Sequence, residues 1–185
     1  MYQDIMVDIE TFGTDADAVV VSIGAVKFNL DGQDTVDSLD NAERVGIWYL
    51  EPEAQLKNAR TVNGQTLLWW LQQSDSARQF IYTMRPTPIT EALEAIATFC
   101  KDSKHLWGNG ATFDNTIIRS LFSTFNVKFP ISYRGDRCHR TLINLLPREQ
   151  KPQFLRYGVQ HNALDDAISQ VLYAQEIYGM LRGGF

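Results

Sequence analysis

The chain has 185 residues, 44% of them hydrophobic, and a formal net charge of −5. This length and composition suit a single domain, residues 1–185, with one sizeable core. We expect a cytoplasmic protein with reduced thiols, because the chain has no apolar run long enough to span a membrane, no secretory signal, and too few cysteines for a disulfide framework. The acidic balance argues against a protein that coats DNA, but it is compatible with one that contacts only a strand end through bound metal ions.

The first third of the chain predicts three strands in succession. The runs Tyr2–Asp8 and Val19–Phe28 are rich in Val and Ile and are typical of buried strands, and Gly46–Glu51 gives a third. An Asp31-Gly32 turn follows the second run and ends it. We therefore predict an antiparallel meander of three strands.

Helical periodicity follows the third strand and alternates with two further strand patterns. The predicted elements are helices at Gln65–Gln73, Asp75–Met84 and Thr90–Lys101, a strand at His105–Trp107, a helix at Asn115–Phe125, a strand around Ser132–Cys138 and a final helix at Asn162–Leu181. Three strands followed by this alternation indicate an α/β protein, with a five-stranded mixed sheet and helices on both faces.

The first chemical motif lies at the end of the first strand. Asp8 and Glu10 are two residues apart, so both side chains point to the same face of the strand. Neighbouring carboxylates repel each other, and a cation between them relieves the repulsion. Hard oxygen ligands favour Mg²⁺ or Mn²⁺ over zinc. Acidic pairs are also common as solvated strand ends, so the motif alone leaves both interpretations open.

The second motif, GNGATFDN, follows the short strand at His105–Trp107. Gly108 and Gly110 allow a sharp turn, and Asp114 opens the next helix. An aspartate at this position can cap the helix or bind a metal ion. Both roles place the carboxylate similarly, so the sequence does not separate them.

The third motif, HNALDDA, opens the final helix and brings His161 close to Asp165 and Asp166. In phosphodiester hydrolysis a neutral imidazole can accept the proton of the attacking water while a carboxylate binds the metal ion. His105 lies in an apolar strand and His139 in a basic segment, which makes both weaker candidates. Helical periodicity does not choose between the two acids, because neither lies in the apolar stripe of the final helix.

Together the three motifs resemble those of the DEDDh 3′→5′ exonucleases, and the resemblance covers nearly the whole chain. That family has D-x-E, then an aspartate after a Gly- or Asn-containing turn, then H-x4-D. The matching residues are Asp8, Glu10, Asp114, His161 and Asp166. WGNGATFDN, TLLWWLQQ, RCHRTL and HNALDDA are similar to the branch of phage exonuclease A, exonuclease VIII and mycobacterial exoribonuclease. Arg140 stands where many relatives outside this branch have an Asp.

The resemblance implies an RNase H-like fold and a 3′→5′ exonuclease that hydrolyses single-stranded RNA or DNA ends to 5′-mononucleotides. It implies that the four carboxylates hold two Mg²⁺ or Mn²⁺ ions about 4 Å apart, with His161 as the general base. The H-x4-D spacing selects Asp166 rather than Asp165 as the metal ligand. The partner would be nucleic acid with a free 3′ end, and relatives are often dimers, so we also expect a homodimer.

Six further residues are expected to contact the substrate: Thr11, Phe12, Trp69, Trp70, Asn109 and Arg137. One of the two tryptophans can stack on the terminal base, whereas the other would pack in the core, because adjacent residues do not share a helix face. Phe12 is expected to wedge between the last two bases. Arg137 belongs to a basic segment, residues 134–156, which either guides phosphates toward His161 or is a solvated cationic face.

Two other functions share parts of this pattern. A non-catalytic nucleic-acid-binding module would keep the fold but release no nucleotide when Mg²⁺ or Mn²⁺ is added. A metal-dependent phosphatase acting on small nucleotides would release inorganic phosphate. The sequence does not decide between RNA and DNA, since no residue is identified that would contact a 2′-hydroxyl group.

Overall fold

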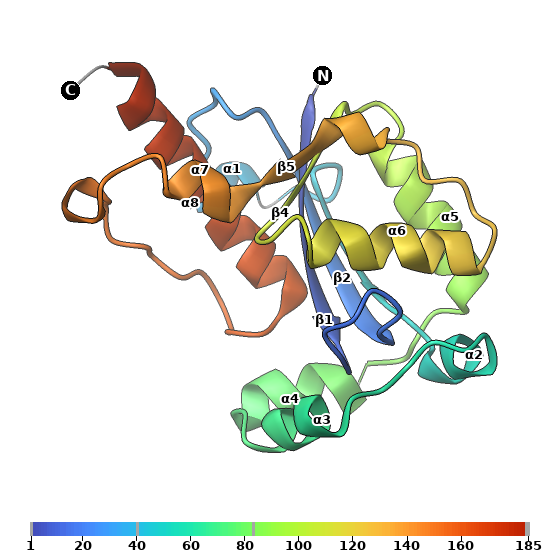
Figure 1. Ribbon diagram of the computed structural model, residues 1–185. Coiled ribbons are helices and arrows are strands. Elements are labelled where there is room, and N and C mark those ends of the chain that lie inside the picture. The colour runs from blue at the N-terminus through green and yellow to red at the C-terminus, as the bar shows by residue number, and fades with distance from the viewer. Residues whose placement is uncertain (1, 40, 83, 184–185) are drawn as a thin grey trace.

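A computed structural model describes residues 2–39, 41–82 and 84–183, and its core is one mixed sheet (Figure 1). The strands are β1 (Asp4–Thr11), β2 (Val20–Phe28), β3 (Val45–Tyr49), β4 (His105–Gly108) and β5 (Asp136–Cys138). Their order in the sheet is β3-β2-β1-β4-β5. β1, β2 and β3 pair antiparallel, whereas β4 pairs parallel with β1 and β5 pairs parallel with β4. The predicted meander and the five-stranded mixed sheet are confirmed.

Helices cover both faces of this sheet. They are α1 (Val36–Leu39), α2 (Pro52–Lys57), α3 (Gly64–Leu71), α4 (Asp75–Tyr82), α5 (Ile89–Cys100), α6 (Asp114–Thr124), α7 (His139–Ile143) and α8 (Ala163–Gly183), with 3₁₀ turns at Tyr133–Gly135 and Arg148–Gln150. α8, α7 and α1 lie on one side of the sheet, and α5 and α6 lie on the other (Figure 1). α3 and α4 lie beyond the end of β1 (Figure 1).

Three helices were not predicted from the sequence: α1, α2 and α7. They have four, six and five residues, too few for a 3.6-residue period to repeat. The strand predicted around Ser132–Cys138 is confined to β5, because residues 133–135 form a 3₁₀ turn. The helix predicted at Asp75–Met84 ends at Tyr82, and Thr83 lies outside the described residues.

Alternation along β1 divides the core into two parts. Ile5, Val7 and Ile9 belong to the cluster that includes the buried residues of α5 and α6. Met6 belongs to the cluster on the opposite face, with residues of β2, α7 and α8. Apolar residues on both faces fix the register of this strand, because a shift by one residue would exchange them. Asp8 follows Met6 on the α8 side of the sheet.

Helix α8 approaches the sheet closely at Gly24. A Cβ atom at this position would lie 2.2 Å from the backbone carbon of Ala163 and 2.3 Å from the backbone nitrogen of Leu164. Gly24 is also the residue of β2 that pairs with Asp8 of β1. A glycine is therefore needed here, and its absent side chain lets the first turn of α8 lie against the strand pair that carries Asp8.

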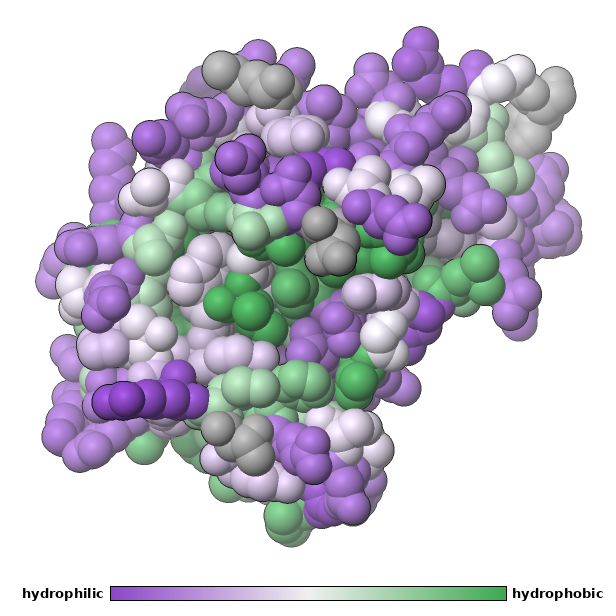
Figure 2. Space-filling model, turned by 180° about the vertical axis from the view of Figure 1, so that it is seen from behind, coloured by the Kyte–Doolittle hydropathy of each residue, from purple (hydrophilic) through white to green (hydrophobic). Residues whose placement is uncertain are grey.

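The surface combines hydrophilic and hydrophobic regions. Seen from behind, hydrophobic residues gather near the middle of the face and hydrophilic ones surround them (Figure 2). Among the described helices, none combines the length and apolarity needed to cross a bilayer. Cys100 and Cys138 are both free, as expected for reduced thiols.

Candidate active site

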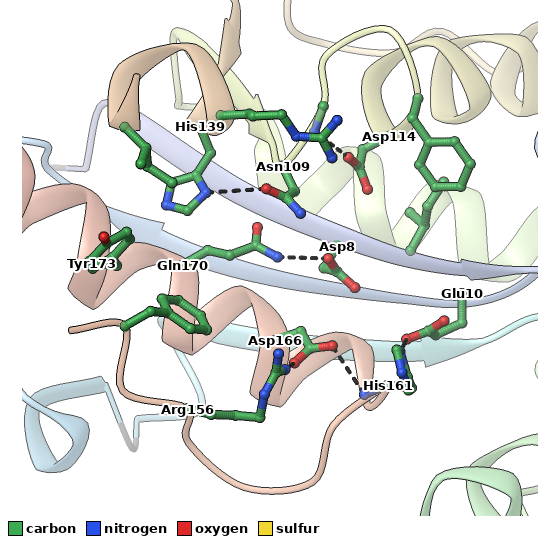
Figure 3. A pocket seen from close by; sticks show the side chains of 16 residues that line it. Asp8, Glu10, Asn109, Asp114, His139, Arg156, His161, Asp166, Gln170 and Tyr173 are labelled. Carbon is green, nitrogen blue, oxygen red and sulfur yellow. Dashed lines mark hydrogen bonds and ion pairs between the residues drawn. The ribbon is translucent and has the colours of Figure 1, made fainter. Parts of the chain in front are cut away.

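Acidic, basic and amide side chains line a cleft of about 660 Å³ at the junction of β1, α6 and α8 (Figure 3). All five residues of the three motifs line it: Asp8, Glu10, Asp114, His161 and Asp166. Asp8 lies between Asp114 and Asp166 in this view (Figure 3). Residues separated by more than 150 positions in the sequence thus share one cleft.

β1 supplies the first two carboxylates. The Asp8 Oδ1 atom accepts a hydrogen bond of 2.7 Å from the Nε2 atom of Gln170, a buried residue of α8. Glu10 is 9% exposed and lies where the pairing of β1 with β2 becomes irregular, between Glu10 and Thr11. This irregularity ends the regular alternation of the strand after Glu10, so the direction of the following side chains cannot be extrapolated from the strand.

The turn after β4 positions Asp114. Its Oδ2 atom accepts a hydrogen bond of 3.0 Å from the main-chain nitrogen of Gly110. A Cβ atom at Gly108 would lie 2.6 Å from the Cβ atom of Asp114, so a larger residue would displace the acid. Phe113 is the N-cap residue of α6 and Asp114 is the first helical residue. Its carboxylate therefore holds the preceding turn instead of capping α6.

The segment before α8 positions His161 and separates the two neighbouring acids. The main-chain nitrogen of His161 donates to the Oδ2 atom of Asp166 over 3.1 Å. The Oδ2 atom of Asp165 instead accepts from the main-chain nitrogen of Val159 over 2.7 Å. Asp165 does not line the cleft, whereas Asp166 does. The two acids therefore face different surroundings, although they are adjacent on the helix.

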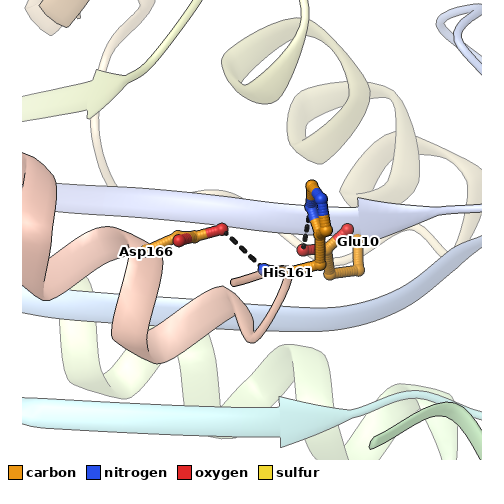
Figure 4. Close-up of side chains that lie close together, drawn as sticks. All are labelled: Glu10, His161 and Asp166. Carbon is orange, nitrogen blue, oxygen red and sulfur yellow. Dashed lines mark hydrogen bonds and ion pairs between the residues drawn. The ribbon is translucent and has the colours of Figure 1, made fainter. Parts of the chain in front are cut away.

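Among the described residues, one group of side chains has ligand atoms close enough together to hold a metal ion. The ligand atoms of Glu10, His161 and Asp166 all lie within 4.8 Å of one another (Figure 4). The Nδ1 atom of His161 is 4.0 Å from the Oε1 atom of Glu10. Carboxylate oxygens on β1 and α8 therefore surround one point, and the imidazole borders it.

Burial and mutual repulsion destabilise the ionised form of the acids in this cleft. Burial raises the pKa of Asp8 well above its ordinary value, and the charges of Asp114 and Asp166 raise it further. The pKa of Glu10 is also raised, mainly by burial and then by the charge of Asp8. Burial also raises the pKa of Asp114, to about 6. Buried oxygen ligands with excess negative charge fit a hard divalent cation, which would offset the repulsion.

The guanidinium of Arg156 partly offsets the charge of one of these acids, Asp166. Arg156 forms an ion pair with Asp166. Burial still raises the pKa of Asp166, because it outweighs the opposing effect of the Arg156 charge. Burial has the opposite effect on the imidazole and lowers the pKa of His161. His161 is therefore neutral near pH 7 and able to accept a proton.

The two tryptophans of α3 lie against the catalytic histidine candidate. The ring centroid of Trp69 is 4.9 Å from that of His161, and the Trp69 residue is 41% exposed. Trp70 is 4% exposed, and its Nε1 atom donates to the carbonyl oxygen of Thr11 over 2.9 Å. Both rings line a second pocket of about 410 Å³ together with Thr11 and Glu10. Only Trp69 offers an accessible ring face, so the neighbours differ as expected from their helix positions.

Asn109 also lines the main cleft, but Phe12 and Arg137 do not. Phe12 faces an apolar pocket that includes Phe80 of α4, because the irregularity after Glu10 turns the chain away from the catalytic side. Arg137 lines a different pocket with Asp4 and residues of β4, and its guanidinium donates to the carbonyl oxygens of Arg134 and Asp136. Phe12 and Arg137 therefore lie apart from the main cleft, and their contacts with the substrate stay predictions.

Sequence reasoning missed Phe154, Gln170 and Tyr173, which line the cleft, and set His139 aside as a weaker candidate. Arg140 and Arg156 also line the cleft, and both belong to the basic segment at residues 134–156 that was expected either to guide phosphates or to be solvated. Burial lowers the pKa of His139 to about 4, so this histidine is a neutral part of the cleft wall. Gln170 lies one helical turn after Asp166, and this i,i+4 spacing was the available signal that both face the same side. No comparable signal marked Phe154, because the segment before His161 has no periodic structure.

Comparisons with known proteins agree with this architecture. A family model described as the Rv2179c-like 3′–5′ exoribonuclease domain matches residues 3–178. A search of curated protein sequences gave no match. Among solved structures, E. coli Exonuclease I in complex with a dT13 oligonucleotide has a TM-score of 0.63 and 13% identity, covering 96% of this chain and 41% of that one.

Two further solved structures are similar to the same degree. E. coli Exonuclease I in complex with a dA16 oligonucleotide has a TM-score of 0.66 and 12% identity, covering 99% of this chain and 42% of that one. A moderately thermophilic Exonuclease I from Methylocaldum szegediense has a TM-score of 0.66 and 13% identity, covering 98% and 41%. The chain thus spans about two fifths of these proteins. At this identity the match shows a shared RNase H-like exonuclease fold.

Proposed function

The chain belongs to the Rv2179c-like 3′–5′ exoribonuclease domain family, a family of phosphodiester-hydrolysing nucleases, and from this membership we propose that it removes 5′-mononucleotides from the 3′ end of single-stranded nucleic acid. The observation that carries the proposal is the convergence of four carboxylates and one neutral histidine on a single cleft. The family description favours RNA as the substrate. Two of the structural relatives were solved with DNA oligonucleotides, so DNA is the alternative.

We propose that Asp8, Glu10, Asp114 and Asp166 hold two divalent cations, Mg²⁺ or Mn²⁺. Their oxygen atoms are hard ligands, and their raised pKa values reflect a need for positive charge in the cleft. When bound, the ions would lower the pKa of a water molecule and offset the charge that develops on the phosphate. Membership of the family implies dependence on divalent metal ions; the choice of Mg²⁺ or Mn²⁺ is part of the proposal.

In this proposal His161 accepts the proton of the attacking water. Burial keeps its imidazole neutral. The Oδ2 atom of Asp166 accepts the hydrogen bond from the His161 main chain, and the Oδ1 atom of the same carboxylate pairs with Arg156. A general base of this kind typically contributes a factor of about 10² to 10⁴ to the rate. The water attacks phosphorus, the bond to the 3′ oxygen of the preceding nucleotide breaks, and a 5′-mononucleotide leaves.

The pocket beside Trp69 is proposed to hold the terminal nucleoside. It adjoins Glu10, and Trp69 presents an exposed aromatic face on which any base can stack. Thr11 lines the same pocket, but its hydroxyl already donates to the carbonyl oxygen of Gly13 over 2.6 Å, so packing is its proposed contribution. Asn109 is proposed to contact the substrate from the opposite wall of the main cleft.

The test is digestion of matched single-stranded RNA and DNA carrying either a 3′ or a 5′ block. With Mg²⁺ or Mn²⁺ we expect mononucleotides from the 5′-blocked strands, no digestion of the 3′-blocked ones, and a faster reaction on RNA. Digestion of a 3′-blocked strand contradicts the polarity, and release of inorganic phosphate instead of mononucleotide supports a phosphatase. Absence of nucleotide release with both metals supports a binding module. The expected homodimer stays a prediction, which light scattering tests.

A further inference from the structure

The segment from Pro152 to His161, which we call the strap, contains no helix or strand but is bound along α8 at regular intervals. The contacts are Tyr173 Oη to Pro152 O (3.0 Å), Tyr157 N to Ser169 Oγ (2.9 Å), Val159 N to Asp165 Oδ2 (2.7 Å) and His161 N to Asp166 Oδ2 (3.1 Å). Every second main-chain nitrogen from residue 157 to residue 161 is therefore held by a side chain of α8. This arrangement fixes the strap as a wall of the cleft.

Besides His161, two side chains of the strap line the cleft, and the one between those two does not. Phe154 and Arg156 are cleft residues, whereas Leu155 is 72% exposed and does not line it. The Phe154 ring packs edge-to-face on Tyr173, with 5.1 Å between centroids. The Arg156 guanidinium lies 5.6 Å from the Phe154 ring centroid and pairs with Asp166. An aromatic ring and a cation are thus held side by side, next to a candidate metal ligand.

The carboxylates lie between two aromatic surfaces of different character. The pocket beside Trp69 shares Ile9, Glu10 and Phe113 with the main cleft, so the two cavities adjoin each other. That pocket is mostly apolar, whereas the strap side of the main cleft adds Arg156 and Phe154. When a nucleic-acid strand is cleaved at the carboxylates, its terminal nucleoside lies on one side of the scissile phosphate. The rest of the nucleic-acid strand, with all its other phosphates, lies on the opposite side. The cationic strap side suits the continuing strand.

We infer that Phe154 and Arg156 form a binding site for the nucleotide next to the terminal one, its base stacked on Phe154 and a phosphate bound by Arg156. This inference rests on the proposed function, because it takes the scissile phosphate to lie at the carboxylates. Stacking on an aromatic ring tolerates any base, and the strap contacts hold the ring in place before substrate binds. The site therefore contributes affinity without selecting a sequence.

The experiment uses an oligonucleotide with 2-aminopurine at the penultimate position, with Ca²⁺ replacing Mg²⁺ and a gel to verify that the strand stays intact. Stacking on Phe154 should quench the fluorescence. Phe154→Leu should remove the quenching and raise Kd about tenfold, and Phe154→Tyr should restore both. With Mg²⁺, Phe154→Leu should raise KM while kcat changes less than about twofold. Leu155→Ala is the matched control on the same strap and should behave as the unaltered protein.

A second measurement tests the arginine independently. Removing one phosphate contact from a single-stranded ligand lowers the slope of log Kd against log salt concentration by about 0.7. Arg156→Gln should show this decrease, and Leu155→Ala should not. Circular dichroism verifies that each variant is folded.

The outcomes separate this inference from the proposed function. If the unaltered protein digests 3′ ends but Phe154→Leu matches Leu155→Ala in quenching and Kd, the strap site is wrong and the proposed function stands. The same holds if Arg156→Gln keeps the full salt slope. If the unaltered protein does not release nucleotides from 3′ ends, the proposed function fails first.

Discussion

The main-chain nitrogen of His161 donates a hydrogen bond to the Asp166 carboxylate that lines the main cleft. His161 has a φ of 65°, in the left-handed region that residues other than glycine rarely adopt. The bond to Asp166 helps to hold this conformation, which costs about 1–3 kcal/mol at such a residue. The proposed base and a proposed metal ligand are therefore positioned together, and each depends on the other.

Asp8→Asn and Asp114→Asn are expected to abolish nucleotide release while the protein stays folded. Each change removes a proposed metal ligand and also relieves repulsion among buried carboxylates, so the free energy of unfolding should stay constant or rise slightly. Denaturation by urea and release of labelled nucleotide at saturating Mg²⁺ measure the two effects. EDTA should abolish activity of the unaltered protein, and added Mg²⁺ should restore it. Turnover close to that of the unaltered protein in either variant contradicts the two-metal proposal.

Asp165 and Asp166 should differ sharply although they are neighbours. Asp166→Asn is expected to lose nearly all activity, because Asp166 lines the cleft and Asp165 does not. Asp165→Asn should keep most activity, since its amide oxygen can still accept the hydrogen bond from Val159. Asp165→Ala removes that acceptor and should reduce kcat by loosening the strap. Steady-state kinetics on the three variants, with Mn²⁺ titration calorimetry, distinguish ligand loss from strap loosening. If Asp165→Asn is the inactive variant, the metal ligand has been assigned to the wrong acid.

The rate is expected to rise with pH, and its acidic limb should lie at a lower pH than a solvated histidine would give. Burial lowers the pKa of His161 from its ordinary value of 6.5, so the imidazole loses its proton at a lower pH than a solvated histidine does. The acidic limb of kcat against pH should therefore lie below pH 6.5 in the unaltered protein. His161→Ala should reduce kcat by a factor of about 10² to 10⁴ and remove this limb. A variant that keeps the same limb would assign it to ionisation of the metal-bound water instead.

His139 is expected to make the protein less stable as the pH falls from 6.5 to 4. Burial lowers its folded-state pKa to about 4, whereas the unfolded chain has the ordinary value of 6.5. In that interval the unfolded state binds a proton that the folded state does not, so protonation favours unfolding. The full difference amounts to about 3 kcal/mol below pH 4. Urea denaturation at pH 7.5 and pH 5 should show a smaller pH effect for His139→Gln than for the unaltered protein. Equal pH effects in the two proteins would contradict this assignment.

The sequence predicted the sheet because its strands carry their own signal. The apolar residues of β1 and β2 pack on both faces of the sheet, and strands buried on both faces are rich in Val and Ile. Short helices such as α7 carry no comparable signal, because their position depends on contacts made after the sheet has formed. The sequence missed α7 for this reason, and with it the place of His139 in the cleft wall.

The sequence by itself determined which residues are chemically equipped for the site. The spacing of Asp8 with Glu10 follows from strand geometry and needs no distant contact. The pairing of His161 with Asp166 instead came from the resemblance to the H-x4-D motif. Only the tertiary structure decided the surroundings: the irregularity that turns Phe12 away from the cleft, the Gln170 amide on Asp8, and the strap that brings Phe154 to the carboxylates. Periodicity in the sequence carries information over only a few residues. The contacts of Gln170 and of the strap instead join segments far apart in the sequence, and these segments meet only when α8 packs against the sheet.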